Sequence, residues 1–256
     1  MTVIATVGTT HPLAFAGLAF AALAIADDGA RPVCIVAGVS AQDANRVTAR
    51  SAVAATTIAA QFAALRDANV EAFHVGALLS AESVHAVADG VASYPNIPAV
   101  IDPVLAATNG DDLADDAARV AIRETLVPRA TLVTPNLDEA AALLERPVAD
   151  IASMREAARA FVALGAHAAL IKGGHLDGDP VDVLAEGDRV TELRARRVDG
   201  TVRGSGDLLA VTIATCLARG ATLTEAIEHG RRRVREAIAT AAPFANTRVA
   251  QLFTGE

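Results

Sequence analysis

The chain has 256 residues, of which 52% are hydrophobic and 20% are charged, and its formal net charge is -8. A chain of this length can bury one large core, and no Pro/Gly/Ser-rich stretch or charge block divides it, so we expect one domain spanning residues 1–256. The acidic balance argues against nucleic acid and anionic lipid as partners and favours small solutes.

The ends of the chain and its cysteines bear on location. Residues 1–26 are apolar but lack a basic leading region, and Gly8 to Pro12 interrupt them before a membrane-spanning length is reached. Cys34 and Cys216 lie far apart in apolar segments without metal-ligand spacing, which favours two buried, reduced thiols. We therefore expect a cytoplasmic protein without a signal peptide.

Short apolar runs alternate with longer stretches of helical periodicity along the first two thirds of the chain. The runs predict buried parallel strands at residues 3–7, 33–39, 72–75, 99–102, 131–134 and 168–172. The periodic stretches predict helices at residues 13–26, 51–68, 81–92, 113–126, 137–144 and 154–164. This alternation is typical of an α/β sheet covered by helices on both faces.

The last third of the chain changes pattern. Residues 182–185 and 190–193 flank a Glu-Gly-Asp turn, which predicts a hairpin and a sheet that is mixed at one edge. After Gly206 the sequence is apolar nearly all round, so we expect a buried helix whose N-terminus opens into the interior. Two helix starts have the spacing of a capping box, namely Ser153 with Glu156 and Thr222 with Glu225.

Four short loops carry the residues that are suited to chemistry. They are Asp102-Pro103-Val104, Thr134-Pro135-Asn136 with Glu139, Lys172-Gly173-Gly174-His175, and Gly204-Ser205-Gly206-Asp207. The first three follow predicted strands and the last begins the buried helix, so all four can converge on one anionic ligand at the carboxyl edge of the sheet. This arrangement indicates a small-molecule kinase.

The last of these loops has two interpretations. Gly204, Ser205 and Gly206 allow backbone N–H groups to approach an anion, and the following helix adds partial positive charge. Asp207 could then accept a proton from a substrate hydroxyl as it attacks a terminal phosphate. The alternative is a glycine-rich turn in which Asp207 only caps the helix.

The other three loops are equally open from their residues alone. Asn136 and Glu139 suit a hydrated Mg²⁺, or they form an Asn cap with a Glu that reaches back to it. Asp102 ends a strand where α/β proteins place ligand groups, or it simply forms a turn. Lys172 is the only lysine of the chain and suits a nucleotide phosphate.

Several further polar residues are assigned a role only from their position along the sequence. The arginines at 231, 232, 233 and 235 predict a solvated helix face. A substrate pocket is favoured at the polar residues that follow the first two strands, namely Thr9, Thr10, His11 and Asp43. His175 is given no catalytic role, because a lone histidine is more often structural.

With these motifs in place, the sequence resembles the ribokinase-like superfamily, and within it the hydroxymethylpyrimidine phosphate kinases of thiamine biosynthesis. The likeness covers nearly the whole chain and is strongest in residues 102–104, 132–140 and 171–175. It implies a three-layer α/β/α fold with a mostly parallel central sheet and a mixed edge. It also implies ATP and Mg²⁺ as cofactors, a hydroxymethyl pyrimidine as substrate, and leaves open a homodimer.

The motifs and the resemblance together give a set of expected site residues. Catalysis falls to Asp207 with Gly204, Ser205 and Gly206. ATP is expected at Thr134, Asn136, Lys172, Gly173, Gly174 and Arg203. The metal ligands are Asp102 and Glu139, and the substrate is expected at Gly8, Thr10, Gln42 and Val104.

The sequence also departs from the family pattern. Residues 13–20, which include two phenylalanines, replace a Gly-Gly-Ala-Gly stretch and a substrate-binding Asp. Thr108-Asn109-Gly110 replaces Lys-Ser-Gly, and Gly-Ser-Gly-Asp replaces Gly-Thr-Gly-Cys, so the base has the form that sugar kinases use. Two alternatives follow: a kinase for pyridoxal or a sugar, and a member of the fold that binds such a ligand without phosphorylating it.

Overall fold

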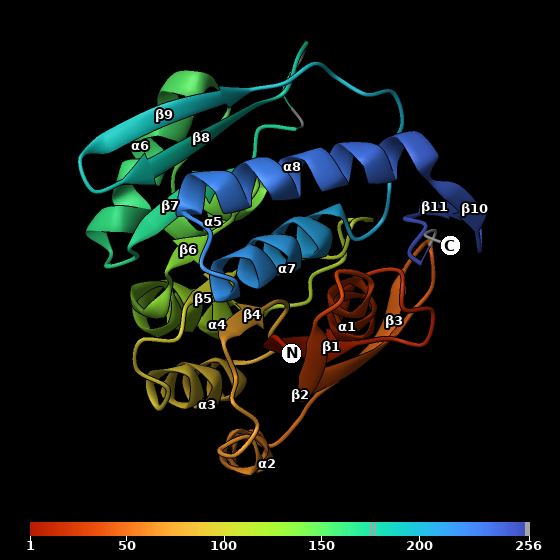
Figure 1. Cartoon of the computed structure of the whole chain (residues 1–256), viewed down its shortest axis with the longest axis vertical. Helices are drawn as coiled ribbons and strands as arrows, with labels where there is room; N and C mark the ends of the chain where they lie inside the picture. The colour runs from red at the N-terminus through yellow and green to blue at the C-terminus, as the bar shows by residue number, and fades with distance from the viewer. Residues whose placement is uncertain (175, 177, 254–256) are drawn as a thin grey trace.

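The computed structural model describes residues 1–174, 176 and 178–253, and in these residues nine strands form one sheet (Figure 1). The sheet order is β3-β2-β1-β4-β5-β6-β7-β8-β9. The strands are β1 (Val3–Thr10), β2 (Arg31–Gln42), β3 (Val47–Ala52), β4 (Ala72–Val75), β5 (Ala99–Ile101), β6 (Leu132–Val133), β7 (Ala168–Ile171), β8 (Val181–Glu186) and β9 (Arg189–Arg194). A separate hairpin is formed by β10 (Ala242–Phe244) and β11 (Thr247–Val249).

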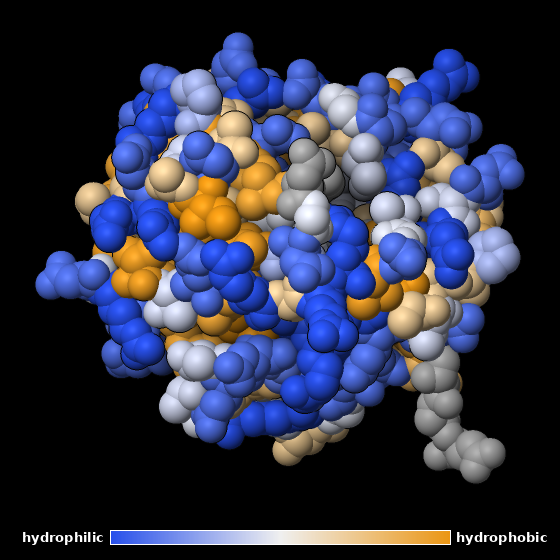
Figure 2. Space-filling view, turned by 90° about the horizontal axis from the view of Figure 1, so that it is seen from above, coloured by the Kyte–Doolittle hydropathy of each residue, from blue (hydrophilic) through white to orange (hydrophobic). Residues whose placement is uncertain are grey.

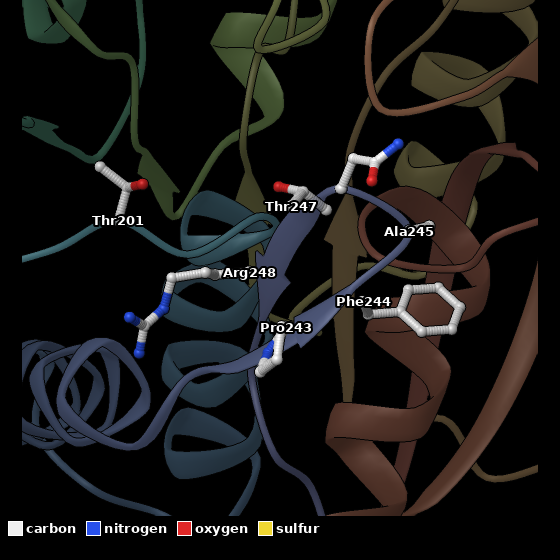
Figure 3. Close-up of a pocket in the computed structure, with 7 residues that line it drawn as sticks. Thr201, Pro243, Phe244, Ala245, Thr247 and Arg248 are labelled. Atoms are coloured by element: carbon white, nitrogen blue, oxygen red, sulfur yellow. The ribbon is translucent and has the colours of Figure 1, made fainter.

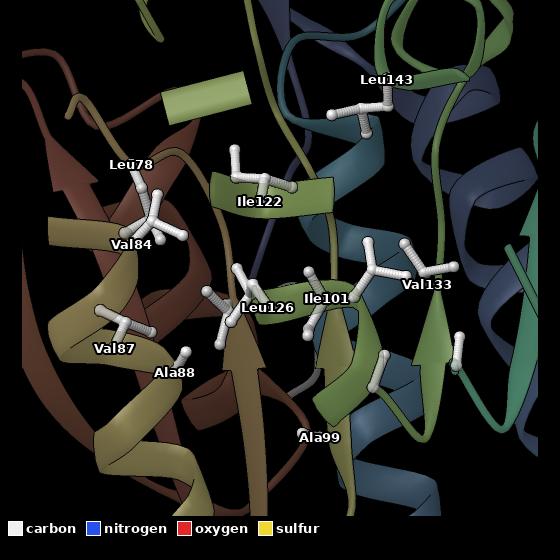
Figure 4. Close-up of a cluster of buried hydrophobic side chains, with 14 of the residues drawn as sticks. Leu78, Val84, Val87, Ala88, Ala99, Ile101, Ile122, Leu126, Val133 and Leu143 are labelled. Atoms are coloured by element: carbon white, nitrogen blue, oxygen red, sulfur yellow. The ribbon is translucent and has the colours of Figure 1, made fainter. Parts of the chain in front are cut away.

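Helices cover both faces of this sheet, as predicted. They are α1 (Gly17–Asp27), α2 (Ala55–Ala64), α3 (Ala81–Ala92), α4 (Asp116–Ala121), η1 (Ile122–Leu126), η2 (Val127–Arg129), α5 (Leu137–Leu144), α6 (Ile151–Ala163), α7 (Ser205–Ala218) and α8 (Leu223–Thr240). One hydrophobic core joins the sheet to α2 through α6, and part of it is drawn in Figure 4. A second core joins the other face to α1, α7 and α8. The three-layer α/β/α prediction is confirmed.

The six predicted central strands are all present and parallel, because apolar runs that are buried on both faces identify such strands well. The predicted hairpin is the antiparallel pair β8 and β9. The sheet is, however, mixed at both edges and not at one, because β3 pairs antiparallel with the end of β2. The predicted helix over 51–68 is therefore wrong at its start, since Ser51 and Ala52 belong to β3.

Helix α7 is the buried helix that the apolar sequence after Gly206 predicts. It lies between the sheet and α8, and its residues from Asp207 to Thr215 are buried. Its N-cap, Gly204, has a φ of 75°, a left-handed conformation that favours glycine. The helix therefore begins abruptly at the carboxyl edge of the sheet, which is where the expected site lies.

Some predicted helix starts are shifted. Helix α6 begins at Ile151, and its capping box is formed by Asp150 with Ser153 and not by Ser153 with Glu156. An acidic N-cap one turn earlier satisfies the free N–H of Ser153 through its carboxylate. The Thr222 box with Glu225 at the start of α8 is confirmed.

The basic cluster on α8 is only partly the solvated face that we predicted, because Arg232 is exposed whereas Arg231 and Arg233 are largely buried. Arg233 forms ion pairs with Asp27 and Asp28 at the end of α1, and Arg231 pairs with Asp182 at 2.7 Å. Both arginine side chains are about six-sevenths buried, with exposed fractions of 14% and 15% respectively. The cluster therefore connects α8 to α1 and β8.

The surface and the cysteines complete the description. Hydrophilic side chains predominate on the face shown in Figure 2. Cys34 is exposed, against prediction; Cys216 is half-buried, and both thiols are free. In the described ranges, none of the helices combines the length and apolar character that crossing a bilayer requires.

Candidate active site

The four predicted loops meet at the carboxyl edge of the sheet. Gly206 shows this directly, because a Cβ atom at this position would lie 2.9 Å from Asp102 Oδ2 and 3.3 Å from Lys172 Nζ. The N-terminus of α7 therefore lies against the groups that end β5 and β7. Only glycine allows this close approach.

Asp102 and Lys172 form the centre of the site. Lys172 Nζ donates to Asp102 Oδ1 at 2.7 Å, and Thr134 Oγ1 donates to the same oxygen at 3.0 Å. The side chain of Asp102 is 1% exposed and that of Lys172 is 17% exposed, so the carboxylate is shielded from water and the ammonium is largely buried. Burial acts to lower the pKa of Lys172, but the carboxylates of Asp102 and Glu139 outweigh it, and the pKa is raised. The lysine is therefore a fixed cation.

The Glu139 side chain both caps helix α5 and lies close to Lys172. It forms the capping box of α5, because Asn136 N donates to Glu139 Oε2 at 2.7 Å and Glu139 N donates to Asn136 Oδ1 at 2.9 Å. Its Oε2 also lies 3.9 Å from Lys172 Nζ. Burial raises the pKa of Glu139 to about 7; Lys172 opposes this shift and Asp102 adds to it. The helix-cap alternative is thus realised, with the carboxylate still inside the site.

Asp207 lies in the first turn of α7 and is 7% exposed. Its Oδ2 accepts a hydrogen bond of 2.9 Å from the backbone N–H of Gly17, at the start of α1. Burial, with a further contribution from the charge of Asp102, raises the pKa of Asp207 to about 6, against the opposing effects of the Gly17 N–H and Lys172. A carboxylate with this pKa is ionised at neutral pH and is well matched to accept a proton.

The loop at residues 11–16 packs directly onto the start of α7. A Cβ at Gly204 would lie 2.6 Å from the carbonyl oxygen of Phe15 and 2.8 Å from the ring of Phe20. Phe15 is 2% exposed, and its ring centroid lies 4.5 Å from that of His11. The phenylalanines that replace the expected glycines are therefore packed inside the protein, next to the candidate site.

Arg203 does not point to the cluster of Asp102 and Lys172. Its guanidinium donates to the carbonyl oxygen of Ala44 and to Thr247 Oγ1, the latter at 3.4 Å, and lies 5.4 Å from the centroid of the Phe15 ring. Its backbone N–H donates to Arg248 O at 2.9 Å. Arg203 thus joins the β2–β3 turn, the 11–16 loop and the β10–β11 hairpin.

The expected substrate residues lie at the same sheet edge, on strands β1 and β2 and after β5. A Cβ at Gly8 would contact Ala77 at 3.6 Å, and Thr10 ends β1. Gln42 ends β2, and Val104 packs against a small apolar cluster beside the β2–β3 hairpin. These residues surround one side of the site, but no hydrogen bond links them to Asp207.

Two open depressions of the surface lie elsewhere. One of about 560 Å³ is lined by Thr201 and by residues 243–248 of the β10–β11 hairpin, as Figure 3 shows. Another of about 370 Å³ lies between α3 and the η1–η2 segment. No group of three or more His, Cys, Asp or Glu side chains forms a metal site within the described residues.

Sequence reasoning missed two groups at the site. The N–H of Gly17 could not be foreseen, because a backbone contact leaves no signature in residue type. His74 on β4 could have been found as the polar residue in an otherwise apolar strand; it is 1% exposed and bonds to Thr6. Burial lowers the pKa of His74 to about 4. His175 lies outside the described residues.

A three-layer α/β/α fold, with an acidic residue on a glycine-rich helix start next to a buried lysine and carboxylates, defines the class of ribokinase-like small-molecule kinases. Residues 16–250 match the family model described as phosphomethylpyrimidine kinase. The chain belongs to this family, and it is a kinase.

Known relatives agree with this assignment. A hydroxymethylpyrimidine/phosphomethylpyrimidine kinase of Rhizobium meliloti is 38% identical over 211 residues, which cover 81% of this chain and 79% of the relative. One from Streptomyces coelicolor is 38% identical over 218 residues, covering 84% and 81%. An ADP complex of Bacillus subtilis pyridoxal kinase is similar in structure, with a TM-score of 0.89, 26% identity, and coverage of 98% of this chain and 97% of that chain.

Proposed function

We propose that the protein transfers the γ-phosphoryl group of ATP to the hydroxymethyl group of hydroxymethylpyrimidine or its phosphate, in thiamine biosynthesis. The substrate is supported by the names of the relatives that are 38% identical to this chain. The observation that carries the proposal is the contact of Gly206 with Asp102 and Lys172. It brings the proposed base and the proposed phosphate-binding groups to one place.

Asp207 is the proposed base. Its carboxylate is ionised at neutral pH, because its pKa of about 6 lies below 7. It would accept the proton of the substrate hydroxyl as that oxygen attacks the terminal phosphorus. The backbone N–H groups of Gly204, Ser205, Gly206 and Asp207 would hold the transferred phosphoryl group at the positive end of α7.

The proposed nucleotide site lies on the β6 and β7 side. Lys172 with Gly173 and Gly174 would border the phosphates, and Thr134 and Asn136 would complete this side from the adjacent strand end. Arg203 was expected here as well. Because its guanidinium is hydrogen-bonded to Ala44 and Thr247, we propose that Arg203 supports the site indirectly, by fixing the β2–β3 turn and the β10–β11 hairpin beside it.

Asp102 and Glu139 are the proposed Mg²⁺ ligands. Their fit rests on charge: three buried carboxylates, those of Asp102, Glu139 and Asp207, face the single ammonium of Lys172. Mg²⁺ needs few protein ligands, since it keeps waters and takes phosphate oxygens. When bound, the ion would neutralise charge that develops on the phosphates.

A second candidate acceptor is pyridoxal. It is favoured by the similarity to Bacillus subtilis pyridoxal kinase, together with a substrate-side loop that contains Phe15 where the family has glycine. The phosphoryl-transfer groups would be the same, and only the acceptor would change. A cytoplasmic location and a homodimer stay predictions.

The test is a measurement of phosphorylated product by mass spectrometry with Mg-ATP and hydroxymethylpyrimidine, its phosphate, pyridoxal or ribose. We expect turnover with the pyrimidines, and a fall of about 10²- to 10⁴-fold in Asp207→Asn with the melting temperature retained. Product from pyridoxal alone would select the second candidate. Thermal stabilisation by these ligands without any product would indicate a binding protein and contradict the proposal.

A further inference from the structure

Arg197 is a charged residue that the proposed reaction does not yet use. It lies between β9 and α7, and its side chain reaches the β7–β8 loop, residues 172–180. Its Nε donates to Gly178 O at 2.6 Å, its Nη1 to Gly174 O at 3.2 Å, and its Nη2 to Leu176 O at 2.5 Å. One guanidinium therefore binds three carbonyl oxygens of the same loop.

The shape of an arginine side chain suits this contact. A guanidinium carries five N–H donors in one plane, so it can bind carbonyl oxygens that are spread along a loop, whereas a lysine concentrates its donors on one atom. Hydrogen bonds from a charged donor are also stronger than those between neutral groups. The backbone N–H of Arg197 donates to Asp179 Oδ1 at 2.9 Å as well. The loop is therefore held by both the side chain and the backbone of Arg197.

The start of the loop is fixed in a different way. Gly173 N donates to Asp182 Oδ1 at 2.9 Å, and a Cβ at Gly173 would lie 1.9 Å from Val181 O, so Gly173 packs against β8. Gly174 is exposed, and no atom of the described residues lies within 4 Å of the place that its Cβ would take. Its φ is also outside the left-handed region. Strand β8 thus holds Gly173, and from Gly174 onward Arg197 holds a loop whose outer side is open.

The place of this contact links Arg197 to the nucleotide. The loop begins with Lys172, on the proposed phosphate-binding side. Arg203, the arginine that the sequence suggested for this side, is bonded to Ala44 and Thr247 instead. A loop that is already ordered binds a ligand with a smaller loss of conformational entropy. The hydrogen bonds of Arg197 are therefore suited to prepare the loop for the phosphates.

We propose that Arg197 is a positioning residue for the nucleotide. By binding the carbonyl oxygens of Gly174, Leu176 and Gly178, it holds the loop after Lys172 in the conformation that accepts the phosphates of ATP. It acts on nucleotide affinity through this loop, and not on the acceptor or on the chemical step. The effect on ATP rests on the proposed function, whereas the hydrogen bonds themselves do not.

Steady-state kinetics of Arg197→Ala test this role. ATP must then order the loop itself, so we expect KM for ATP to rise about tenfold, with kcat and KM for the acceptor within about twofold of the wild type. Arg194→Ala is the matched control. It removes the same charge from the end of β9, but its guanidinium bonds to Glu192 of its own strand at 2.6 Å, so KM for ATP should be unchanged. Equal rises in both variants, or a wild-type KM in a folded Arg197→Ala variant, would overturn the inference.

The open side of Gly174 offers a second, independent probe. A carboxylate at this position would repel the phosphates, whereas an amide of the same size would not. We expect KM for ATP to rise about tenfold in Gly174→Asp and no more than about threefold in Gly174→Asn, both with the melting temperature of the wild type. Equal KM values in the two variants would show that the loop does not border the phosphates, and would overturn the inference.

Calorimetry with Mg²⁺ and the non-hydrolysable analogue AMP-PCP separates binding from turnover. We expect a Kd about tenfold higher in Arg197→Ala than in the wild type and in Arg194→Ala, together with faster hydrogen exchange in residues 172–180. A wild type that forms product, with an unchanged Kd in Arg197→Ala, would overturn this inference and leave the proposed function standing. A wild type that binds the analogue in this Arg197-dependent way, but forms no product, would refute only the proposed function.

Discussion

Single residues set the acid–base chemistry of the site. Asp207 and Glu139 are both buried carboxylates with raised pKa values, of about 6 and about 7, but their contacts differ. Glu139 is held by the backbone of its own helix, whereas Asp207 is held by the N–H of Gly17 from another helix. The carboxylate of Glu139 is therefore fixed at the start of α5, whereas the carboxylate of Asp207 lies where the N-termini of α1 and α7 meet.

The pH dependence of the reaction rate should reflect the ionisation of Asp207. If the ionised carboxylate of Asp207 is the base, as we propose, kcat/KM should fall as the pH drops below about 6, by about tenfold per pH unit. Steady-state rates between pH 5 and 8 measure this limb. Glu139→Gln removes the second titration and should keep the Asp207 limb. A flat profile down to pH 5 would contradict the role of Asp207.

The free energy of unfolding should depend on pH through the protonation of His74. Its pKa is about 4 in the folded state and about 6.5 when unfolded, so between these values the unfolded state binds more protons. This contribution to stability is therefore present above pH 6.5 and is lost as the pH falls toward 4. From pH 7 to 5 the loss should be about 2 kcal/mol.

Urea denaturation of the wild type and of His74→Gln at both pH values isolates this contribution. The difference between the two proteins removes the opposing contributions of Glu139 and Asp207, whose raised pKa values stabilise the folded state on acidification. A difference in the free energy of unfolding that does not change with pH would show that His74 is not buried in its neutral form.

Individual elements show which parts of the fold a sequence can predict. The central strands were predicted correctly because both of their faces are buried and their sequences are apolar throughout. Strand β3 was missed because nearly all of its side chains are exposed, so no alternation of apolar and polar residues marks it. The start of α1 was placed too early, since residues 13–16 are apolar but form a loop with Ala14 at a φ of 48°.

The same limit applies to the site. The four loops were predicted because strand ends and helix starts carry local signals, such as Pro after a strand or glycine before a helix. The surroundings of Arg203 were not predictable, because Ala44, Phe15 and Thr247 come from three segments that are distant in sequence. Its expected role at the nucleotide was an inference from its neighbours along the chain alone.

Arg203 should therefore hold the β2–β3 turn and the β10–β11 hairpin in place, and should have little effect on the chemical step. In Arg203→Ala the contacts to the β2–β3 turn and to the β10–β11 hairpin are lost. We expect KM for the acceptor to rise about tenfold with little change in kcat. Hydrogen exchange should accelerate in residues 43–47 and 242–249, as mass spectrometry can measure. A change in KM for ATP alone would instead support the nucleotide role that the sequence suggested.

At the scale of the whole molecule, α8 is attached to elements from the other end of the chain. Arg233 bonds to Asp27, Asp28 and Thr212, and so joins α8 to α1 and α7. This contact joins the C-terminal end of α1 to the middle of α7, and these are the two helices whose N-terminal ends meet at Asp207. The sequence could not reveal it, since the partners are separated by about two hundred residues.

Arg233→Ala should destabilise the whole fold. It leaves two largely buried carboxylates without their cation, and we expect a loss of about 2 kcal/mol in the free energy of unfolding. Arg235→Ala is the matched control on the same helix; within the described residues its side chain bonds to one backbone carbonyl, that of Arg196, and the loss should be within about 0.5 kcal/mol. Thermal and urea unfolding measure both. Equal losses in the two variants would contradict a specific role of the Arg233 contacts.

Lys172 has a practical consequence for experiments on this protein. Lys172 is the only lysine in the sequence, and its ε-amino group is held by Asp102. Biosynthetic labelling with ¹³C-lysine would therefore give a single lysine Cε signal, which comes from the centre of the molecule. That peak would follow the arrival of a nucleotide without any engineered label.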